Sequence, residues 1–169
     1  DEQRDKILSQ SKLIKQGLNL KKNAVLKQDL EPLIDNLITR LDEKKGGFKG
    51  QPKFPTFYFF DSLIYFYNKT KKQKYLDHVD LFLKNICSQG IFDHVEGGIF
   101  RYTVDENWLI PHFEKMFYDN IQLIILLAKY LKIKKNDYFR NKLIKTIDFL
   151  LKNFFIEDHS LMGTAIDAD

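Results

Sequence analysis

The sequence has little cysteine and no long apolar run, and each shortage excludes a class of protein. Its only cysteine among 169 residues is Cys87, so an intrachain disulfide is impossible. The helical spacing of Cys87 from Leu83 and Val79 predicts a buried, unreactive thiol. The longest apolar run, residues 121–128, is interrupted by Gln122 and is far shorter than the ~20 residues of a membrane span. The chain also begins without an apolar signal region, and we expect a cytoplasmic protein with no membrane partner.

Arginine is also scarce, although the formal net charge is +4. Lysines are spread over every expected helix and are mixed with acidic residues. A nucleic-acid-binding surface would instead gather Lys and Arg on one face or in one arm. The charge pattern therefore predicts a lysine-rich solvated surface, and no nucleic acid is expected as a partner.

Helical periodicity and phenylalanine are abundant, with 15 Phe residues available for an aromatic core. No alternating strand pattern of any length occurs, so the expected fold class is all-α. Pro32 marks a helix start or a kink, and Pro55 and Pro111 stand where helices are expected to begin. The expected helices cover about 4–20, 24–44, 55 onward, 72–89, 111–132 and 136–155.

The loops between the expected helices resemble one another. Each carries an acid followed by glycine, and the glycines are roughly 50 to 65 residues apart, about the length of one helical hairpin with its loops. Hairpins stacked side by side place equivalent loops at one end, so the residues that follow each loop should share one mouth. The loops are LDEKKGGF at 41–48, FDHVEGGIF at 92–100 and EDHSLMG at 157–163, and the mouth would gather Lys53 and Phe54, residues 101–112 and residues 167–169.

The segment PHFEKMFYDN carries the first group of candidate site residues. If a helix starts at Pro111, Glu114 lies in its first turn, where a carboxylate matches the helix dipole. His112 and Asp119 would then lie on one face about 10 Å apart, at two ends of a pocket. His112 is a candidate general acid or base, and the alternative is a histidine that bonds a backbone carbonyl.

The segment RYTVDENW carries a second group. Arg101 is a planar donor suited to carboxylates or sugar hydroxyls, and the rings of Tyr102 and Trp108 suit the apolar face of a sugar. Asp105 could accept hydrogen bonds from hydroxyl groups. Alternatively, an Arg101–Asp105 salt bridge simply fastens the loop.

The segment TAIDAD carries two acids, Asp167 and Asp169. Paired carboxylates can carry out acid/base chemistry on a sugar, or they can bind a hard cation. Two acids in such a segment are also commonly just solvated. One cysteine and four scattered histidines provide no zinc spacing, and GGFKG lacks the spacing of a phosphate-binding loop. We therefore expect no metal and no cofactor.

Three stretches together carry a resemblance to a known family. GGFKGQPKFP, FDHVEGGIFRYTVDENWLIPHFEKMFYDNIQL and TAIDAD, in that order, resemble the YyaL-like thioredoxin-domain proteins, whose animal members are called spermatogenesis-associated protein 20. The resemblance covers about residues 25–169 and implies a partial (α/α)6 toroid of the six-hairpin glycosidase type. It implies that residues 1–23 are a helical connector after an absent thioredoxin-like domain, and that residues 24–169 form the first two to three hairpins.

Three positions depart from the family pattern. Glu96 stands where the family has glycine, Phe100 where it usually has histidine, and Gly163 where it usually has an aromatic residue. The change at Phe100 bears on chemistry, because it removes an imidazole next to Arg101 in the sequence.

The resemblance implies a carbohydrate epimerase or glycosidase type of acid/base chemistry. The expected catalytic residues are His112, Glu114, Asp105, Asp167 and Asp169, and the expected substrate-binding residues are Arg101, Tyr102, Trp108, Asp119, Lys53 and Phe54. An alternative function is a non-catalytic module that docks a thioredoxin-like domain, and a further alternative is an inactive remnant. Uncovered helix faces of a partial toroid would favour a homo-oligomer or poor solubility.

Overall fold

The computed structural model describes residues 4, 6–12 and 29–168. They belong to two units, residues 1–32 and 33–169, and each unit is considered by itself. In the first unit residues 6–12 are helical, and the rest of the connector expected over 1–23 lies mostly outside the described residues. All candidate site residues belong to the second unit, and one of them, Asp169, lies outside the described residues.

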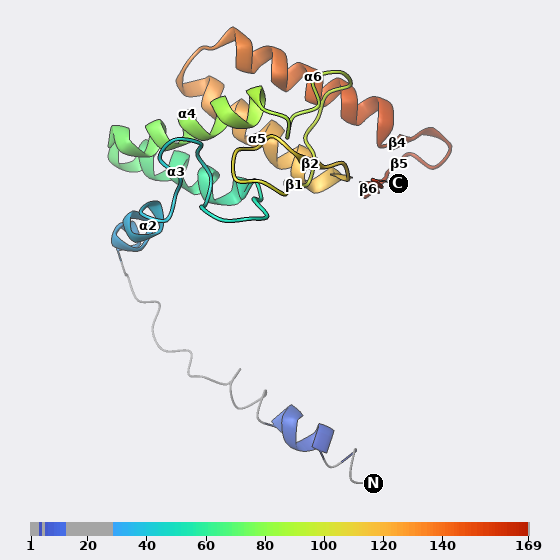
Figure 1. Cartoon of the computed structure of the whole chain (residues 1–169), viewed down its shortest axis with the longest axis horizontal. Helices are drawn as coiled ribbons and strands as arrows, with labels where there is room; N and C mark the ends of the chain where they lie inside the picture. Colours follow the sequence, from blue (N-terminus) through green and yellow to red (C-terminus); the bar gives the residue numbers. More distant parts are fainter. Residues whose placement is uncertain (1–3, 5, 13–28, 169) are drawn as a thin grey trace. The chain divides into compact units, whose positions relative to one another are not determined.

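The second unit consists mainly of two helical hairpins that lie side by side (Figure 1). A short helix precedes them, and the first helices of the two hairpins, α3 and α5, pack against each other. The all-α prediction is therefore confirmed. The helices are α2 (Glu31–Ile38), α3 (Phe57–Thr70), α4 (Gln73–Ser88), α5 (Phe117–Ile133) and α6 (Asp137–Asn153).

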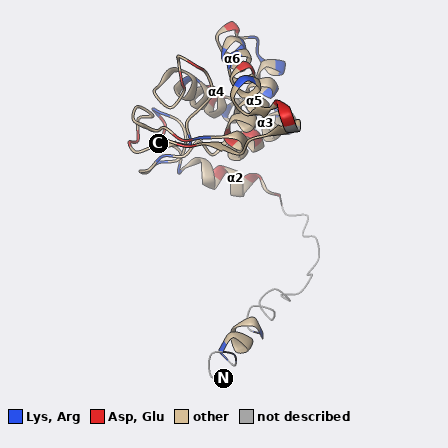
Figure 2. Cartoon of the chain, turned by 90° about the vertical axis from the view of Figure 1, so that its right-hand side faces the viewer, with Lys and Arg blue, Asp and Glu red and all other residues tan. Residues whose placement is uncertain are grey.

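The core lies between the facing sides of these helices. Phe60 of α3 stacks on Phe82 of α4 with ring centroids 3.7 Å apart, as expected for a phenylalanine-rich chain. Cys87 is fully buried, and burial raises the pKa of its thiol to about 12, so the prediction of an unreactive thiol is confirmed. The helices carry basic and acidic residues interspersed on their surfaces (Figure 2), and none of the described helices is long and apolar enough to cross a bilayer.

The loops that lead into α3 and α5 are built alike, which explains their similar sequences. In each, an aspartate near the loop start accepts two backbone N–H groups: Asp42 from residues 44 and 45, and Asp93 from residues 95 and 96. A buried lysine that comes just before the next helix then binds the same aspartate. Lys53 Nζ lies 3.1 Å from Asp42, and Lys115 Nζ lies 2.6 Å from Asp93.

Each loop also depends on one glycine in the left-handed region. Gly47 and Gly98 both have φ of 76°. A Cβ added to Gly47 would lie 2.5 Å from the Trp108 ring, and one added to Gly98 would lie 2.5 Å from the Phe149 ring. Only glycine meets both requirements, since other residues are strained at this φ and would clash with a buried ring.

Two expected helix boundaries are wrong. The helix expected over 24–44 ends at Ile38, and Leu41 belongs to a bridge with Phe48, while residues 24–28 lie outside the described residues. Of the two alternatives for Pro32, a helix start or a kink, the structure has the helix start, since α2 begins at Glu31. The helix expected from Pro111 begins only at Phe117. Residues 111–116 are instead extended and form parts of two short strand pairs, which local periodicity does not reveal.

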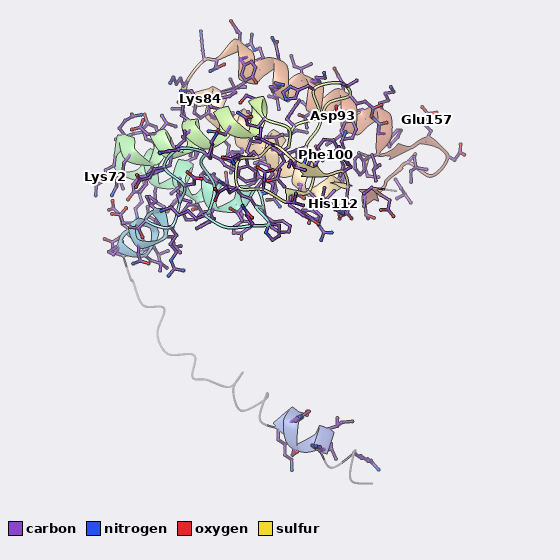
Figure 3. All side chains as sticks on the ribbon, in the orientation of Figure 1. Lys72, Lys84, Asp93, Phe100, His112 and Glu157 are labelled. Atoms are coloured by element: carbon purple, nitrogen blue, oxygen red, sulfur yellow. The ribbon has the colours of Figure 1, made fainter. Side chains whose placement is uncertain are left out.

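These short strands gather the loops at one end of the hairpins. Here β1 (Tyr102–Thr103) pairs with β2 (Pro111–His112), and β3 (Lys115–Met116) pairs with β6 (Ala165–Ile166). Lys53 also forms a bridge with Thr103. In Figure 3, His112 and Phe100 lie at this end, and Lys72 lies at the opposite end beside the tight α3–α4 turn.

The remaining strands form a separate hairpin after α6. It consists of β4 (Phe155–Ile156), the 3-10 turn η1 (Glu157–His159) and β5 (Leu161–Met162). Gly163 has no positive φ, so the third glycine loop does not repeat the geometry of the other two. The expectation of loops at one end holds, because β6, which follows this hairpin, pairs with β3.

We expect Lys115→Met to lower the free energy of unfolding by about 3 kcal/mol, because it leaves the partly buried Asp93 carboxylate without its cation. Lys129→Met is the matched control. Lys129 pairs with Asp61 on the surface, so its loss should cost less than about 1 kcal/mol. Urea unfolding followed by circular dichroism measures both variants, and equal losses would contradict a central role for the buried pair.

Candidate functional site

Three segments that are distant in the sequence form the candidate site, which we call the rim: residues 53–56, 101–119 and 164–168. Backbone hydrogen bonds join them. Lys53 and Thr103 exchange N–H···O bonds of 2.8 and 3.0 Å, and the Phe117 N–H donates to the Thr164 carbonyl at 3.0 Å. The prediction of a shared mouth is therefore supported by direct contacts between the three segments.

Arg101 and Glu114 form the electrostatic centre of the rim. Their side chains are 2.8 Å apart, Nη1 to Oε2, and the Arg101 N–H donates to the Glu114 carbonyl, also at 2.8 Å. Glu114 does not lie in a helix, so its predicted role beside the helix dipole is wrong. Its carboxylate and the hydroxyl of Tyr118 raise the pKa of Arg101, which stays charged.

His112 lies next to this ion pair. Its Nδ1 is 4.0 Å from Glu114 Oε2, which is within electrostatic range but beyond hydrogen-bond distance. That nitrogen is buried and has no hydrogen-bond partner among the described residues, and the same holds for Arg101 Nε. Because buried polar atoms are normally satisfied, both atoms are candidates for contact with a ligand.

A row of three rings crosses the rim. The His112 imidazole stacks on Tyr102, with centroids 4.8 Å apart and planes 13° from parallel. The other neighbour of Tyr102 is Phe54, also at 4.8 Å. The row joins the loop before α3 to β1 and β2, so Phe54, Tyr102 and His112 are brought together as the sequence predicted.

Asp119 lies in the first turn of α5 beside a cavity of about 380 Å³. The residue is only 8% exposed, and its carboxyl group forms no hydrogen bond with any described residue. Thr56 Oγ1, a third buried atom without a partner, belongs to the same cavity. The cavity lining is Phe54, Pro55, Thr56, Tyr58, Tyr118, Asp119 and Gln122.

Burial raises the pKa of Asp119 to about 7, opposed by the charge of Arg101 and reinforced by that of Glu114. The carboxyl therefore changes its protonation state near neutral pH, as an acid/base group must. The helix geometry assumed for His112 and Asp119 is wrong, since His112 is in β2, yet both residues belong to the rim.

Asp105 has a structural role that the sequence did not reveal. Its carboxylate accepts the N–H groups of residues 107, 109 and 110 and thereby shapes the turn. These bonds keep its pKa below the ordinary value against the opposing effect of burial. The alternative of an Arg101–Asp105 salt bridge is wrong, because Arg101 pairs with Glu114, and an acid/base role for Asp105 has no support in this geometry.

Trp108 and Lys53 are also structural. Trp108 is 0% exposed, and its indole N–H donates to the Lys45 carbonyl at 2.9 Å, so its ring offers no face to a ligand. Lys53 is 2% exposed and is held by Asp42 and the Glu106 carbonyl. We correct the expectation that these two side chains bind substrate: the buried tryptophan and lysine hold the rim to the core.

Asp167 follows β6. Continuing the β3–β6 register by one residue places its backbone opposite Glu114, and its carboxylate accepts the N–H of Ala168 at 2.7 Å. Its role in chemistry stays a prediction. Among the described residues no group of three or more His, Cys, Asp or Glu side chains forms a potential metal site.

Sequence reasoning missed several residues at or beside the rim. Asn120 is fully buried and clamps the loop before it, accepting the Ile99 N–H at 2.7 Å and donating to the Met116 carbonyl at 2.8 Å. An asparagine at the start of the apolar helix sequence was a signal that could have identified this residue. Thr56 and Gln122 gave no signal, because only folding brings α3 and α5 together around the cavity.

Phe100 lies in a different cavity, of about 510 Å³, whose lining includes Phe113, Lys115 and Phe149. Its ring packs edge-to-face on Phe113 with a centroid distance of 5.3 Å. The cavity beside Asp119 does not include Phe100. Loss of a histidine at this position therefore leaves the cavity of Asp119 intact.

No family model matches the sequence, but individual relatives do. Spermatogenesis-associated protein 20 of Rattus norvegicus is 33% identical over 119 residues, which are 66% of this chain and 15% of the relative. The human protein of that name is 33% identical over 105 residues, 58% of this chain. An uncharacterised Caenorhabditis elegans protein is 37% identical over 101 residues, or 57% of this chain and 14% of its own. The predicted resemblance is confirmed, and the chain spans only about 15% of the rat relative.

Solved structures show the same fold. Cellobiose 2-epimerase from Spirochaeta thermophila superposes with a TM-score of 0.68 at 16% identity, covering 84% of this chain and 42% of the epimerase. A D-mannose isomerase gives 0.65 at 15% identity, covering 88% and 41%. A glycoside hydrolase family 76 mannosidase from Bacteroides thetaiotaomicron gives 0.63 at 14% identity, covering 83% and 41%. The chain therefore has the fold of part of an (α/α)6 toroid.

We expect Asp119→Asn to stabilise the protein progressively as pH rises. A carboxyl whose pKa is raised to about 7 in the folded state binds protons more tightly there than in the unfolded chain. The wild type therefore loses stability between about pH 4 and pH 7, by at most about 4 kcal/mol, and the amide variant does not. Urea unfolding at several pH values measures this difference.

The matched control is Asp148→Asn, because Asp148 is exposed on α6 away from the rim. Its pH profile should follow that of the wild type. Parallel profiles for Asp119→Asn and the wild type would show that this carboxyl is ionised like any surface acid.

Proposed function

We propose that this chain, which is homologous to a segment of the spermatogenesis-associated protein 20 family, forms one wall of a carbohydrate site and moves protons there. The observation that carries the proposal is the group of buried polar atoms without partners at the rim: Thr56 Oγ1, Arg101 Nε and His112 Nδ1. Sugar hydroxyls both donate and accept hydrogen bonds, so they suit such a mixed set. The structural neighbours are named as carbohydrate epimerases, isomerases and glycosidases, which favours this ligand class.

His112 and Glu114 are the proposed proton carriers. An imidazole can both accept and donate a proton, and Glu114 lies 4.0 Å away, close enough to stabilise the imidazolium. Arg101 holds Glu114 in place through the 2.8 Å ion pair, and its side chain, which is 40% exposed, can donate to the ligand. Tyr102 fixes the plane of the imidazole by stacking, which limits the directions in which His112 can transfer a proton.

This arrangement suits epimerase or glycosidase chemistry on a sugar, in which a proton is removed from carbon or delivered to oxygen. We assign acid/base roles to His112 and Glu114, and we retain Asp167 and Asp169 as further candidates. The complete activity would involve the rest of a toroid. In longer relatives it would also involve a thioredoxin-like domain before the region that corresponds to this chain. We propose a cytoplasmic location for such a protein.

A second candidate function is docking of a partner protein at the rim. The turn after β1 and the segment before β3 expose four apolar side chains, Val104, Leu109, Ile110 and Phe113. Clustered apolar groups of this kind mark interaction sites. The occupant we propose is a thioredoxin-like domain. A stripe on α6, Ile144, Ile147 and Leu151, is also exposed and supports the proposal of self-association.

For the carbohydrate function, we expect cellobiose or mannose to bind the chain, and His112→Ala and Arg101→Lys to weaken binding at least tenfold. A lost hydrogen bond to a charged or buried group corresponds to about this factor, and lysine lacks the planar donor fork. Isothermal titration calorimetry measures the affinities. His94→Ala is the control, because His94 bonds the Gln89 carbonyl outside the cavity of Asp119. Absence of binding by both sugars would contradict the proposal.

For the docking function, we expect Ile110→Ser and Phe113→Ser to abolish binding of a separately expressed thioredoxin-like domain, because both remove exposed apolar area. His112→Ala should leave docking unchanged. Size-exclusion chromatography with light scattering measures both the complex and any self-association. A complex insensitive to the serine variants would place the partner elsewhere.

A further inference from the structure

We propose that the cavity between the first turns of α3 and α5 is a subsite for one uncharged sugar ring, which Asp119 binds through a hydrogen bond. The inference rests on the proposed carbohydrate function and deepens it by naming the substrate class. Such a subsite would accept neutral sugars and reject anionic ones such as uronates.

The cavity has the size and lining of a small-molecule site. Its volume of about 380 Å³ falls within the range of ligand pockets. Three aromatic residues, Phe54, Tyr58 and Tyr118, belong to its wall. Aromatic faces pack well against the C–H faces of a pyranose, while the hydroxyl groups at the ring edge need polar partners.

Those polar partners are present in the same cavity. Thr56 Oγ1 is buried without a hydrogen bond, and Gln122 adds an amide with both donors and acceptors. Asp119 is 8% exposed and has no hydrogen-bond partner among the described residues. Its neighbour Asn120 differs, because the Asn120 amide bonds the backbone at Ile99 and Met116, whereas the Asp119 carboxyl is left available to a ligand in the cavity.

The charges around Asp119 favour its neutral form and a neutral ligand. From the loop side, Arg101 and Glu114 act on Asp119 with opposite signs, and the two are already paired with each other. From α3 and α5 the cavity residues are Thr56, Tyr58, Tyr118 and Gln122, none of which is a cation. With burial as the largest effect, the Asp119 pKa is about 7, so near neutrality the carboxyl can donate a hydrogen bond.

An anionic sugar would meet a buried acid with no free cation in the cavity lining. Its carboxylate would have to be desolvated beside Glu114 and Asp119, which is unfavourable in a site of low dielectric. A neutral ring has no such cost. The cavity therefore discriminates by rejecting negative charge as well as by attracting hydroxyl groups.

The cavity adjoins the proposed proton carriers. Phe54 belongs to its lining and contacts Tyr102, which in turn stacks on His112, with both centroid distances 4.8 Å. Tyr118, also in the lining, lies close enough to Arg101 to help raise the pKa of the guanidinium. A ring held by Asp119 would thus lie alongside the Arg101–Glu114–His112 group, which is the geometry of a subsite next to a reacting position.

Glucose and glucuronate test the inference, because they differ by one carboxylate. We expect glucose to bind the wild-type chain at pH 6 and about tenfold more weakly at pH 8, since the protonated fraction of Asp119 falls by roughly that factor. Glucuronate should bind at least tenfold more weakly than glucose at both pH values. NMR chemical-shift titration of the chain gives the dissociation constants.

The variant Asp119→Asn keeps a neutral hydrogen-bond donor, so it should bind glucose with nearly the same affinity at pH 6 and pH 8. The control Asp148→Asn should retain the tenfold pH dependence. A preference for glucuronate, a pH-independent wild type, or an unchanged pH dependence in Asp119→Asn would each overturn the inference, even if sugar binding depends on His112. Failure of every variant to bind glucose, cellobiose or mannose would overturn the proposed function itself.

Discussion

The rim depends on a buried lysine that binds an aspartate from the preceding loop, an interaction that occurs twice. Lys53 with Asp42 and Lys115 with Asp93 each tie a glycine loop to the start of the next helix. Both ammonium groups also lie over aromatic rings, 4.8 Å from the Trp108 centroid and 4.1 Å from the Phe149 centroid. Desolvated contacts of this type are geometrically demanding, so they fix where α3 and α5 begin. Every group at the rim is positioned relative to those two points.

Polar groups at and beside the rim differ in how fully they are bonded. Some polar groups are fully bonded: Asp105 accepts several backbone N–H groups, and Asn120 of α5 uses its whole amide. By contrast, Arg101 Nε and His112 Nδ1 are buried and unpaired among the described residues. Leaving such atoms without partners costs stability, and folded proteins tolerate that cost mainly where a ligand or a neighbouring segment can complete the bonds.

The sequence predicted the helices well because each buries one face, and the resulting periodicity is local information. Leu76, Val79 and Leu83 repeat at helical spacing and are all buried in α4. Residues 111–116 were predicted as helix because Pro111 and Glu114 suit a first turn. Their extended conformation is fixed instead by pairing with residues 102–103 and 165–166, which no local pattern encodes. The role of Trp108 was predicted wrongly for the same reason, because its hydrogen-bond partner is distant in the sequence: it is the carbonyl of Lys45, 63 positions earlier. A buried Trp and a ligand-stacking Trp look alike until such a contact is known.

The two equivalent loops differ chiefly in length. Both have the aspartate–lysine pair that anchors the loop, but only the longer one carries candidate site residues between the two anchors. From aspartate to lysine the first loop advances 11 positions, whereas the second advances 22 and carries Arg101, Tyr102 and His112. The longer loop keeps the same anchor points and adds its extra residues between them. Evolution could therefore exchange the inserted stretch for another while the scaffold around it stays unchanged. Ligand specificity can therefore change through the inserted residues, with little effect on the stability of the hairpins.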